Sequence, residues 1–492
     1  MANQKMSDQA WLAIATNERL PAHWGKIRQG NDGLIEEASA ETMAMDFRSM
    51  TQRHPERFAS LALRLSPSTK PTFLGAILSG LAWPGDQNGR LEEGWVPPSH
   101  KVLEEVLALP TVQELARGHE LEMARNLCRI LERYPEHPWS EGALDLLIWV
   151  AQHHRDPEPG VYPVGSTQED SAGFDRLEAN ALNVTRGTAG FAIRSLLFQQ
   201  PATFSRLRPA IESLVRDEHP AVRVAALAAC LPVVKIDRPL AVDWYLQAGE
   251  GPDSILATRE AADIFRHMYR THLDRLRPLI ERMIASPQPR AATAGAVQAA
   301  ASFLVMGQME EEFKRCLGGT PAQRKGIAQV AASLLQEPEF AEGAKATLLR
   351  MSDDEDKEVG RAVAHSFRQL NLLHIESDRE AWNRFARSKA FQAEPLYLLH
   401  ALSRQEGKLL PFADCLLAVG DTFAEELADA AKDFSTRISG DVHELFPLLL
   451  RLYEQVQRED RQLYLRCLDL WDRLLERRVG AAMGLTRELD RF

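Results

Sequence analysis

The stretch that decides the fold begins with RGTAGFAIRSLLF (186–198), a run of small and apolar residues that opens on an arginine. Five further runs of this kind follow it: RVAALAACLPVV (223–234), REAADIFRHMY (259–269), RAATAGAVQAAASFLV (290–305), RKGIAQVAASLL (324–335) and RAVAHSFRQL (361–370). Successive leading arginines are 37, 36, 31, 34 and 37 residues apart. A fixed period in the mid-thirties with one apolar helix per unit is typical of a helical repeat array.

A second set of helical segments lies between these runs. Two of them contain the sequence RLRP, at 206–209 and at 275–278, and the 69 residues between the two copies equal about two periods. Short polar turns join the segments, as expected for antiparallel helix pairs. The sequence therefore predicts an all-α fold, an α-solenoid built from helical hairpins.

The helical pattern is regular in only part of the chain. We expect an N-terminal helical region at 1–154, a long loop rich in Gly and Pro at 155–182, regular repeats at 183–370, and degenerate C-terminal helical repeats with a cap at 371–492. A long loop inside a compact domain is usually functional or mobile. We therefore expect the main boundary of the chain at 155–182.

The turn DEHPAVRVAALAA (217–229) resembles the turn of HEAT repeats, in which an acid precedes the arginine that opens the second helix. This resemblance implies HEAT-like hairpins and a structural ladder in which acids and arginines connect neighbouring repeats. A planar guanidinium can bind a carboxylate and helix-end carbonyls together. Three units carry an acid six residues before the arginine: Asp217 and Arg223, Asp253 and Arg259, Glu355 and Arg361. Asn180, Ile284 and Gly318 occupy the acid's position in three other units, so we expect a broken ladder.

Composition limits the cellular setting and the ligand. The 492 residues are 45% hydrophobic and 26% charged, with a net charge of −11 that disfavours nucleic acid as a partner. The five cysteines are far apart, which indicates buried, reduced thiols. The N-terminus does not have the pattern of a signal peptide, and no apolar run is long enough to span a membrane. We expect a cytoplasmic protein.

No motif in the sequence predicts catalysis, a metal or a cofactor. HELEM (119–123) lacks the second histidine of a zinc motif, and G-x-x-x-x-G-K-[ST] is absent, so no phosphate-binding loop is expected. We expect a protein that is not an enzyme. Three aromatic residues in the long Gly/Pro-rich segments are candidates for partner binding, because aromatic residues dominate binding hot spots: Trp83, Trp95 and Tyr162. Each of them is also suited to fix its loop to the helices.

Four segments in this order carry a wider resemblance: SDQAWLAIA (7–15), HPERFASLALRLSPSTKPTFLGAILSGL (54–81), ALNVTRGTAGFAIRSLLF (181–198) and DEHPAVRVAALAA (217–229). They resemble the C-terminal helical sensor region of bacterial STAND-type antiviral defence NTPases. In that family an effector and an ATPase precede a repeat array that senses an invader protein. The resemblance implies a protein partner, which would be an effector, an ATPase or an invader protein.

These observations give one leading hypothesis and two alternatives. The leading hypothesis is a HEAT-like scaffold or sensor that binds a protein partner in a bacterial antiviral defence or signalling system. The first alternative is a HEAT-like nucleic-acid-binding protein or DNA glycosylase, against which the acidic net charge argues. The second is a regulator that a protease cuts in the 155–182 loop.

Overall fold

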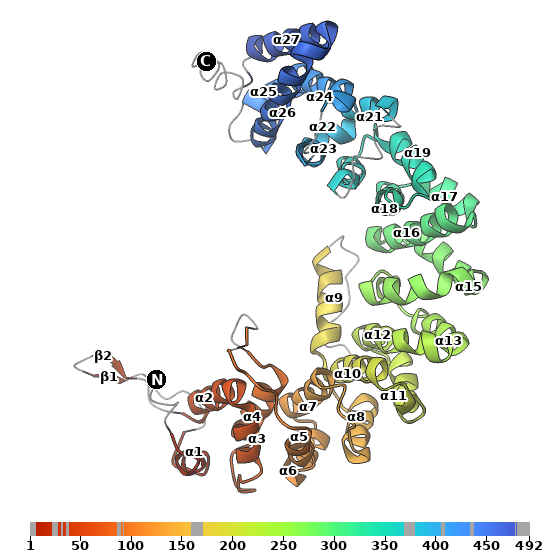
Figure 1. Cartoon of the computed structure of the whole chain (residues 1–492). Coiled ribbons are helices and arrows are strands. Elements are labelled where there is room, and N and C mark those ends of the chain that lie inside the picture. Colours follow the sequence, from red (N-terminus) through yellow and green to blue (C-terminus); the bar gives the residue numbers. More distant parts are fainter. Residues whose placement is uncertain are drawn as a thin grey trace. The chain divides into compact units, whose positions relative to one another are not determined.

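The chain forms two compact units, Met1–Leu276 and Arg277–Phe492. The computed structural model describes residues 6–21, 28–30, 33–35, 39–85, 90–91, 93–158, 171–368, 379–404, 409–432, 437–477 and 479. Helices account for most of these residues in both units (Figure 1). The all-α fold and the repeated helical hairpins predicted from the sequence are confirmed.

The described elements of unit 1 are α1 (Asp8–Ala15), β1 (Arg28–Gly30), β2 (Gly33–Ile35), α2 (Ala40–Arg53), α3 (Pro55–Ala62), α4 (Pro71–Ala82), α5 (His100–Leu107), α6 (Pro110–Arg117), α7 (Leu121–Arg133), α8 (Glu141–His153), α9 (Ser171–Asn183), α10 (Thr185–Gln199), η2 (Pro201–Thr203), α11 (Phe204–Val215), α12 (Pro220–Ile236), α13 (Arg238–Ala248), α14 (Asp253–Leu256) and α15 (Arg259–Ile284). Helix α15 kinks at His272, and its last turns belong to unit 2. The strands β1 and β2 form a small antiparallel hairpin, which the sequence did not predict.

The described elements of unit 2 are α16 (Pro289–Met306), α17 (Glu310–Leu317), α18 (Pro321–Leu334), α19 (Ala341–Met351), α20 (Lys357–Ala364), η3 (His365–Arg368), α21 (Arg379–Ala386), α22 (Lys389–Ala393), α23 (Pro395–Ser403), η6 (Leu410–Phe412), α24 (Ala413–Glu425), α25 (Ala428–Lys432), α26 (Arg437–Glu459) and α27 (Arg461–Glu476). Most of the expected C-terminal cap, residues 480–492, lies outside the described residues. No helix in the described ranges is long and apolar enough to cross a bilayer.

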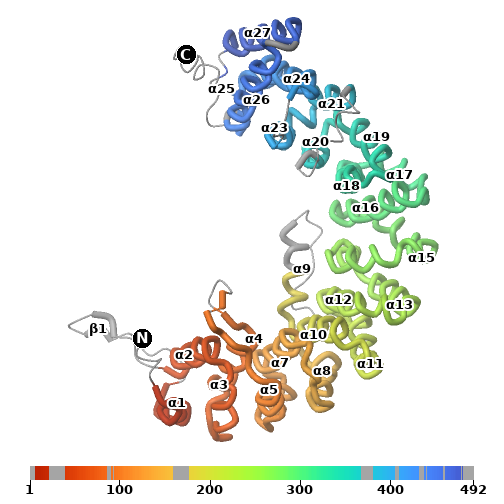
Figure 2. The backbone as a smooth tube through the Cα atoms, in the orientation of Figure 1, coloured from red at the N-terminus to blue at the C-terminus, as the bar shows by residue number. Residues whose placement is uncertain are grey.

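Unit 1 has two layers of helices (Figure 2). The inner layer consists of α2, α4, α7, α10 and α12, each packed against the next. Helices α3, α5, α6, α8, α11 and α13 form the outer layer. In unit 2, α16, α18, α20 and α22 pack in the same successive way, with α17 and α19 beside them. Each hairpin thus buries its apolar face against its neighbours, as a repeat protein requires.

Proline and small polar residues determine where many of these helices begin. Helices α4, α12, α16 and α18 have proline in their first turn, where the missing N–H group costs no helical hydrogen bond. Before α2, the Ser39 side chain accepts from the main-chain N–H of Thr42, and the Thr42 hydroxyl accepts from the N–H of Ser39. This capping box satisfies two main-chain donors at the end of the helix. The sequence itself therefore determines these helix starts.

Glycines allow consecutive inner helices to approach closely. A Cβ atom on Gly80 of α4 would lie 2.6 Å from Cβ of Thr51 in α2. On Gly326 of α18 it would lie 2.4 Å from the carbonyl oxygen of Thr293 in α16. Real Cβ atoms do not approach other atoms this closely, so a larger residue would push the two helices apart. The alanine-rich runs act in the same way, because small side chains let helix axes approach.

The 155–182 segment contains more helix than the sequence predicted. Its second half forms α9, and residues 159–170 lie outside the described ranges. The segment is an insertion in the turn between α8 and α10 of one hairpin. The hydroxyl and the N–H of Thr185, at the start of α10, both donate to the carboxylate of Asp156, over 2.6 and 2.5 Å. The two ends of the insertion are thereby joined, and α10 packs on α7 and α12 as the other inner helices pack on theirs.

The glycine contacts predict a difference between two alanine substitutions in unit 2. Gly326→Ala places a methyl group against the main chain of α16, so we expect a loss of about 2–3 kcal/mol in the free energy of unfolding. Gly440→Ala is the control, because a Cβ atom there meets nothing within 4 Å and alanine favours helix. Urea denaturation of the full chain measures both. Equal stability of the two variants would show that the inner helices do not need this contact.

Candidate functional site

Arginines on inner helices bind carboxylates in the turn of the following hairpin. In unit 1, Nε and Nη2 of Arg186 on α10 donate to the two carboxylate oxygens of Asp217 over 2.8 and 3.1 Å. Nη1 donates to the carbonyl oxygen of His154, 2.6 Å away in the preceding turn. One guanidinium therefore fixes two successive turns. The pairing of an inner-helix arginine with the carboxylate in the turn of the following hairpin is called a rung below.

The same rung recurs in both units. Arg125 on α7 donates to the carboxylate of Asp156 over 2.9 Å. In unit 2, Arg324 on α18 binds both carboxylate oxygens of Asp354 over 2.6 and 3.0 Å, and the carbonyl oxygen of Gly319 over 2.5 Å. In these three rungs the acid follows its arginine by 31, 31 and 30 residues. The rungs connect neighbouring hairpins, as the resemblance to HEAT repeats implies.

The sequence predicted that three arginines pair with acids six residues before them. In the rungs, the arginine instead binds an acid that follows it by 30 or 31 residues. Arg223 reaches Asp217 only through its main-chain oxygen, 2.5 Å away, because the carboxylate is bound to Arg186. Glu355 is 87% exposed and pairs with Lys389. Its predecessor in the sequence, Asp354, holds the rung instead. Thus the ladder is not broken at Arg186 or Arg324, although Asn180 and Gly318 stand six residues before them.

The other predicted ladder residues have different surroundings. Arg361 forms ion pairs with Glu358 at 2.6 Å and with the buried Glu394 at 3.2 Å, and Glu394 follows it by 33 residues. The guanidinium of Arg259 is 83% exposed and lies 3.7 Å from Asp263. Asp253 begins the short helix α14.

The pKa values of two rung acids, Asp354 and Asp156, are lowered by the hydrogen bonds that they accept. Burial alone would raise the pKa of Asp354, but hydrogen bonds from Arg324 and from the N–H of Asp356 outweigh it and hold the pKa below its ordinary value. At Asp156, burial is likewise outweighed by hydrogen bonds from Thr185 and Arg125, which lower the pKa. Both acids are therefore charged at neutral pH.

His154 lies beside the rung of Arg186. Its side chain is 1% exposed, and its Nδ1 accepts a hydrogen bond from the N–H of Asp156 over 3.1 Å. Burial, and then the neighbouring His119, lower the pKa of His154 from 6.5 to about 4. The imidazole is thus neutral at physiological pH, and protonation must disturb the turn.

The candidate partner-binding aromatics separate into two roles. The indole N–H of Trp95 donates to the carbonyl oxygen of Gln52 over 2.8 Å, so this half-buried residue attaches its loop to the helices. Trp83 follows α4 directly and is 49% exposed, with the Arg129 guanidinium 5.2 Å from its ring centroid. Tyr162 lies outside the described residues. Of the three aromatics, Trp83 presents the most open surface within the described ranges.

Trp83 lies at the rim of a hollow of about 330 Å³ in the inner layer of unit 1, called the inner groove below. Three exposed apolar side chains line it: Met45, Trp83 and Leu182, which are 66%, 49% and 41% exposed. The middle of the groove is lined by the small residues Gly75, Ala76 and Ser79 of α4. The other lining residues come from α2, α4, α7 and the α9–α10 region: Glu41, Ala44, Arg48, Thr72, Glu122, Arg125, Asn126, Arg129, Asn183 and Thr188. Sequence reasoning found only Trp83, because the groove joins side chains from helices far apart in the chain.

The inner helices run in the same direction, so charge is ordered along the groove. Thr51 of α2 lies against Gly80 of α4 and Phe47 against Phe73, which shows that these two helices are parallel. Each of α2 and α7 has a glutamate near its start and an arginine seven residues later: Glu41 and Arg48, Glu122 and Arg129. The acidic groups lie toward one end of the helices and the basic groups toward the other.

Several lining residues are held in place by their neighbours. Arg129 pairs with Glu132 at 2.6 Å and also donates to the carbonyl oxygen of Leu182. Arg125 belongs to the rung of Asp156. Arg48 and Glu122 are exposed, and no other residue in the described ranges forms a hydrogen bond or ion pair with either side chain. Their charges are therefore available to a ligand.

Metal-binding clusters and reactive thiols are two kinds of site that the described residues do not form. No group of three or more His, Cys, Asp or Glu side chains in the described ranges could hold a metal ion. All five cysteines are free and buried, and burial raises the pKa of each thiol. A thiol with a raised pKa is a poor nucleophile.

No family model and no curated protein matches the sequence. Among solved structures, the Kap95:Nup1 complex is similar with a TM-score of 0.37 and 12% identity over 98% of this chain and 63% of that one. Karyopherin Kap121p bound to the SUMO protease Ulp1p has a TM-score of 0.35 and 12% identity over 90% and 54%. The Pds5–Scc1 complex has a TM-score of 0.27 and 11% identity over 95% and 75%. The chain thus spans less than two thirds of the two karyopherins, and TM-scores below 0.5 assign neither family nor function.

The rung in unit 2 predicts unequal effects for two neighbouring acids. Asp354→Asn removes the charge that binds Arg324, so we expect a loss of about 2–3 kcal/mol in the free energy of unfolding. The matched control is Glu355→Gln, for which we expect a change of at most about 0.5 kcal/mol because this acid is exposed. Urea denaturation of the full chain decides between them. A larger effect of Glu355→Gln would favour the six-residue pairing.

The buried His154 predicts acid sensitivity. Because its pKa is lower in the folded chain than its ordinary 6.5, its contribution to stability is intact above pH 6.5 and is lost as the pH falls toward about 4. We expect the loss to reach about 2–3 kcal/mol. His154→Asn keeps an acceptor for the N–H of Asp156 and should be less sensitive in this window, whereas His153→Asn, at an exposed position, should match the wild type. Identical pH profiles of all three proteins would contradict the assignment.

Proposed function

We propose that this chain is a non-enzymatic helical-repeat protein that binds a segment of a partner protein in the inner groove of unit 1. The observation that supports this most is the gathering of exposed apolar residues there. Nine large hydrophobic residues in the described ranges are exposed, and three of them, Met45, Trp83 and Leu182, line this one groove. Single exposed apolar residues are normal, but a cluster around a hollow marks an interaction site.

The support beneath the groove favours binding with little rearrangement. Arg129 fixes the ring of Trp83 and the end of α9, and Arg125 fixes the turn that contains Asp156. Side chains that are already held lose little conformational entropy when a ligand binds. An aromatic anchor at the rim and a floor of small residues then provide the apolar contacts that dominate hot spots.

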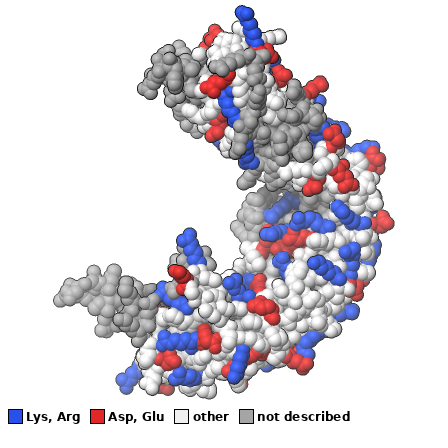
Figure 3. Space-filling model, viewed as in Figure 1, with Lys and Arg blue, Asp and Glu red and all other residues white. Residues whose placement is uncertain are grey.

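Nucleic-acid binding is the less favoured reading of the same face. Two of the three arginines that line the groove, Arg125 and Arg129, are already paired with carboxylates. The groove is also lined by the acids Glu41 and Glu122, and basic and acidic side chains are mixed on the side of the molecule that Figure 3 shows. A phosphate backbone needs a continuous basic track. We therefore expect that DNA and RNA give no gel shift at low ionic strength, or a shift that added salt does not change.

The cellular setting of this binding is proposed from sequence alone. The resemblance of 7–15, 54–81, 181–198 and 217–229 to sensor regions of STAND-type defence NTPases supports a role in bacterial antiviral defence or signalling. In that setting the partner would be an effector, an ATPase or an invader protein. Genes for an ATPase, nuclease or protease beside the gene for this chain are the expected observation.

Selection of peptides from a displayed random library on the full chain tests the groove. We expect Met45→Glu and Trp83→Ala to weaken the selected peptides at least about tenfold, because each removes apolar contact at the rim. Leu465→Glu is the control, since Leu465 is 55% exposed but lies on α27 in the other unit. Melting curves establish that the variants fold. Peptides whose affinity is insensitive to both groove variants would place the binding surface elsewhere.

A further inference from the structure

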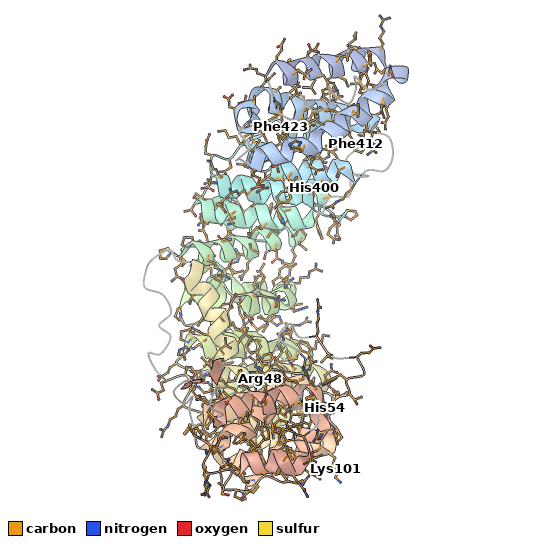
Figure 4. All side chains as sticks on the ribbon, turned by 90° about the vertical axis from the view of Figure 1, so that its left-hand side faces the viewer. Arg48, His54, Lys101, His400, Phe412 and Phe423 are labelled. Atoms are coloured by element: carbon orange, nitrogen blue, oxygen red, sulfur yellow. The ribbon has the colours of Figure 1, made fainter. Side chains whose placement is uncertain are left out.

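The two available charges of the inner groove lie at opposite corners of it. Arg48 is near the end of α2, and Glu122 is in the first turn of α7 (Figure 4 labels Arg48). Helix α4 lies between them: the carbonyl oxygen of Arg48 is 2.8 Å from a Cβ atom built on Gly80, and Oε2 of Glu122 is 3.9 Å from one built on Gly75. A line from Arg48 to Glu122 therefore crosses the small residues of α4 obliquely.

The length of this diagonal follows from helix geometry. Two steps between packed helices amount to roughly 16–20 Å, and the five residues from Gly75 to Gly80 add about 7 Å along the helix axes. The diagonal is thus about 20 Å long, which equals about 13 residues of α-helix. An extended chain would cover it with about six residues.

The floor favours a helix over an extended chain. An extended ligand needs partners for its main-chain N–H and C=O groups, whereas a helix satisfies these groups internally. The side-chain amide of Asn126 is already bound to the carbonyl oxygen of Gly75, and the hydroxyl of Thr188 to that of Thr185. Small residues on the floor, in contrast, let the apolar face of a helix approach closely.

The positive charge of Arg48 and the negative charge of Glu122 favour one of the two directions in which a helix could lie along the diagonal. Acidic residues are favoured in the first turn of a helix and basic residues in the last, because of the helix dipole. A ligand helix with this common distribution matches the groove when its acidic first turn lies at Arg48 and its basic last turn at Glu122. Met45 lies one turn before Arg48 on α2, and with Trp83 at the other side it borders the apolar stripe of such a ligand.

Building on the proposed function, we propose that the partner segment is an amphipathic α-helix of about 13 residues that crosses the inner groove from α2 to α7. Its acidic N-terminal turn binds Arg48, its basic C-terminal turn binds Glu122, and its apolar stripe lies on Gly75, Ala76 and Ser79.

A designed peptide of this length is the probe, with an apolar stripe, glutamates in its first turn, lysines in its last turn and a fluorescent label. We expect Arg48→Glu and Glu122→Lys each to weaken its binding to the full chain about tenfold, as fluorescence anisotropy measures. Lys101→Glu is the matched control, because Lys101 is 86% exposed on α5, outside the groove, and it should leave the affinity within about twofold. Equal effects of Arg48→Glu and Lys101→Glu would overturn the charge assignment.

Two altered peptides test the conformation and the direction of the ligand. A proline in the centre breaks a helix, so this peptide should lose at least about tenfold in affinity; retained affinity would mean that the ligand is extended. A photo-crosslinker at the acidic end should label α2, and one at the basic end should label α7. The opposite labelling would overturn the proposed direction.

The outcomes separate this inference from the proposed function. If library-selected peptides lose affinity with Met45→Glu and Trp83→Ala but the designed helix does not bind, the groove is a binding site and the helical ligand is wrong. If neither kind of peptide depends on the groove, both proposals fail.

Discussion

The fold depends on one interaction that is repeated along the chain: the guanidinium of an inner helix binds the carboxylate in the turn of the next hairpin. Arg186 and Asp217 show why it matters, since the same guanidinium also binds a carbonyl oxygen of the preceding turn. A hairpin of two helices buries too little apolar surface to be stable alone. The rung holds the next hairpin close enough to cover the apolar face of the first one.

The spacing that the rungs set must agree with the contact between inner helices. At Gly80 and Gly326 the main chain of one helix lies so close to its neighbour that a methyl group has no room. The charged turns and the small-residue contacts therefore act together, because a close approach of the inner helices brings each turn within reach of the arginine before it. Asp156 is an example: it pairs with Arg125 although the connection in which it lies also contains a whole helix, α9.

The inner groove is a consequence of the same packing. Where α4 carries Gly75, Ala76 and Ser79, the inner layer is low, and the longer side chains of α2 and α7 rise on both sides. Arg125 connects the groove to the rungs, since it lines the groove and also forms a rung with Asp156. A surface built on such a support is held in shape before any partner arrives, which is the condition for tight binding by a shallow site.

The sequence by itself determined the helical hairpins and their period, because apolar periodicity, helix caps and turns are local properties of the chain. It also named Trp83 as one of three candidate aromatics, with Trp95 and Tyr162. Only the tertiary structure decided which acid each arginine binds, since Asp354 rather than Glu355 reaches Arg324 across about thirty residues. The inner groove was equally beyond the sequence, because α2, α4 and α7 contribute to it side chains that are distant in the chain and neighbours only after the hairpins have packed.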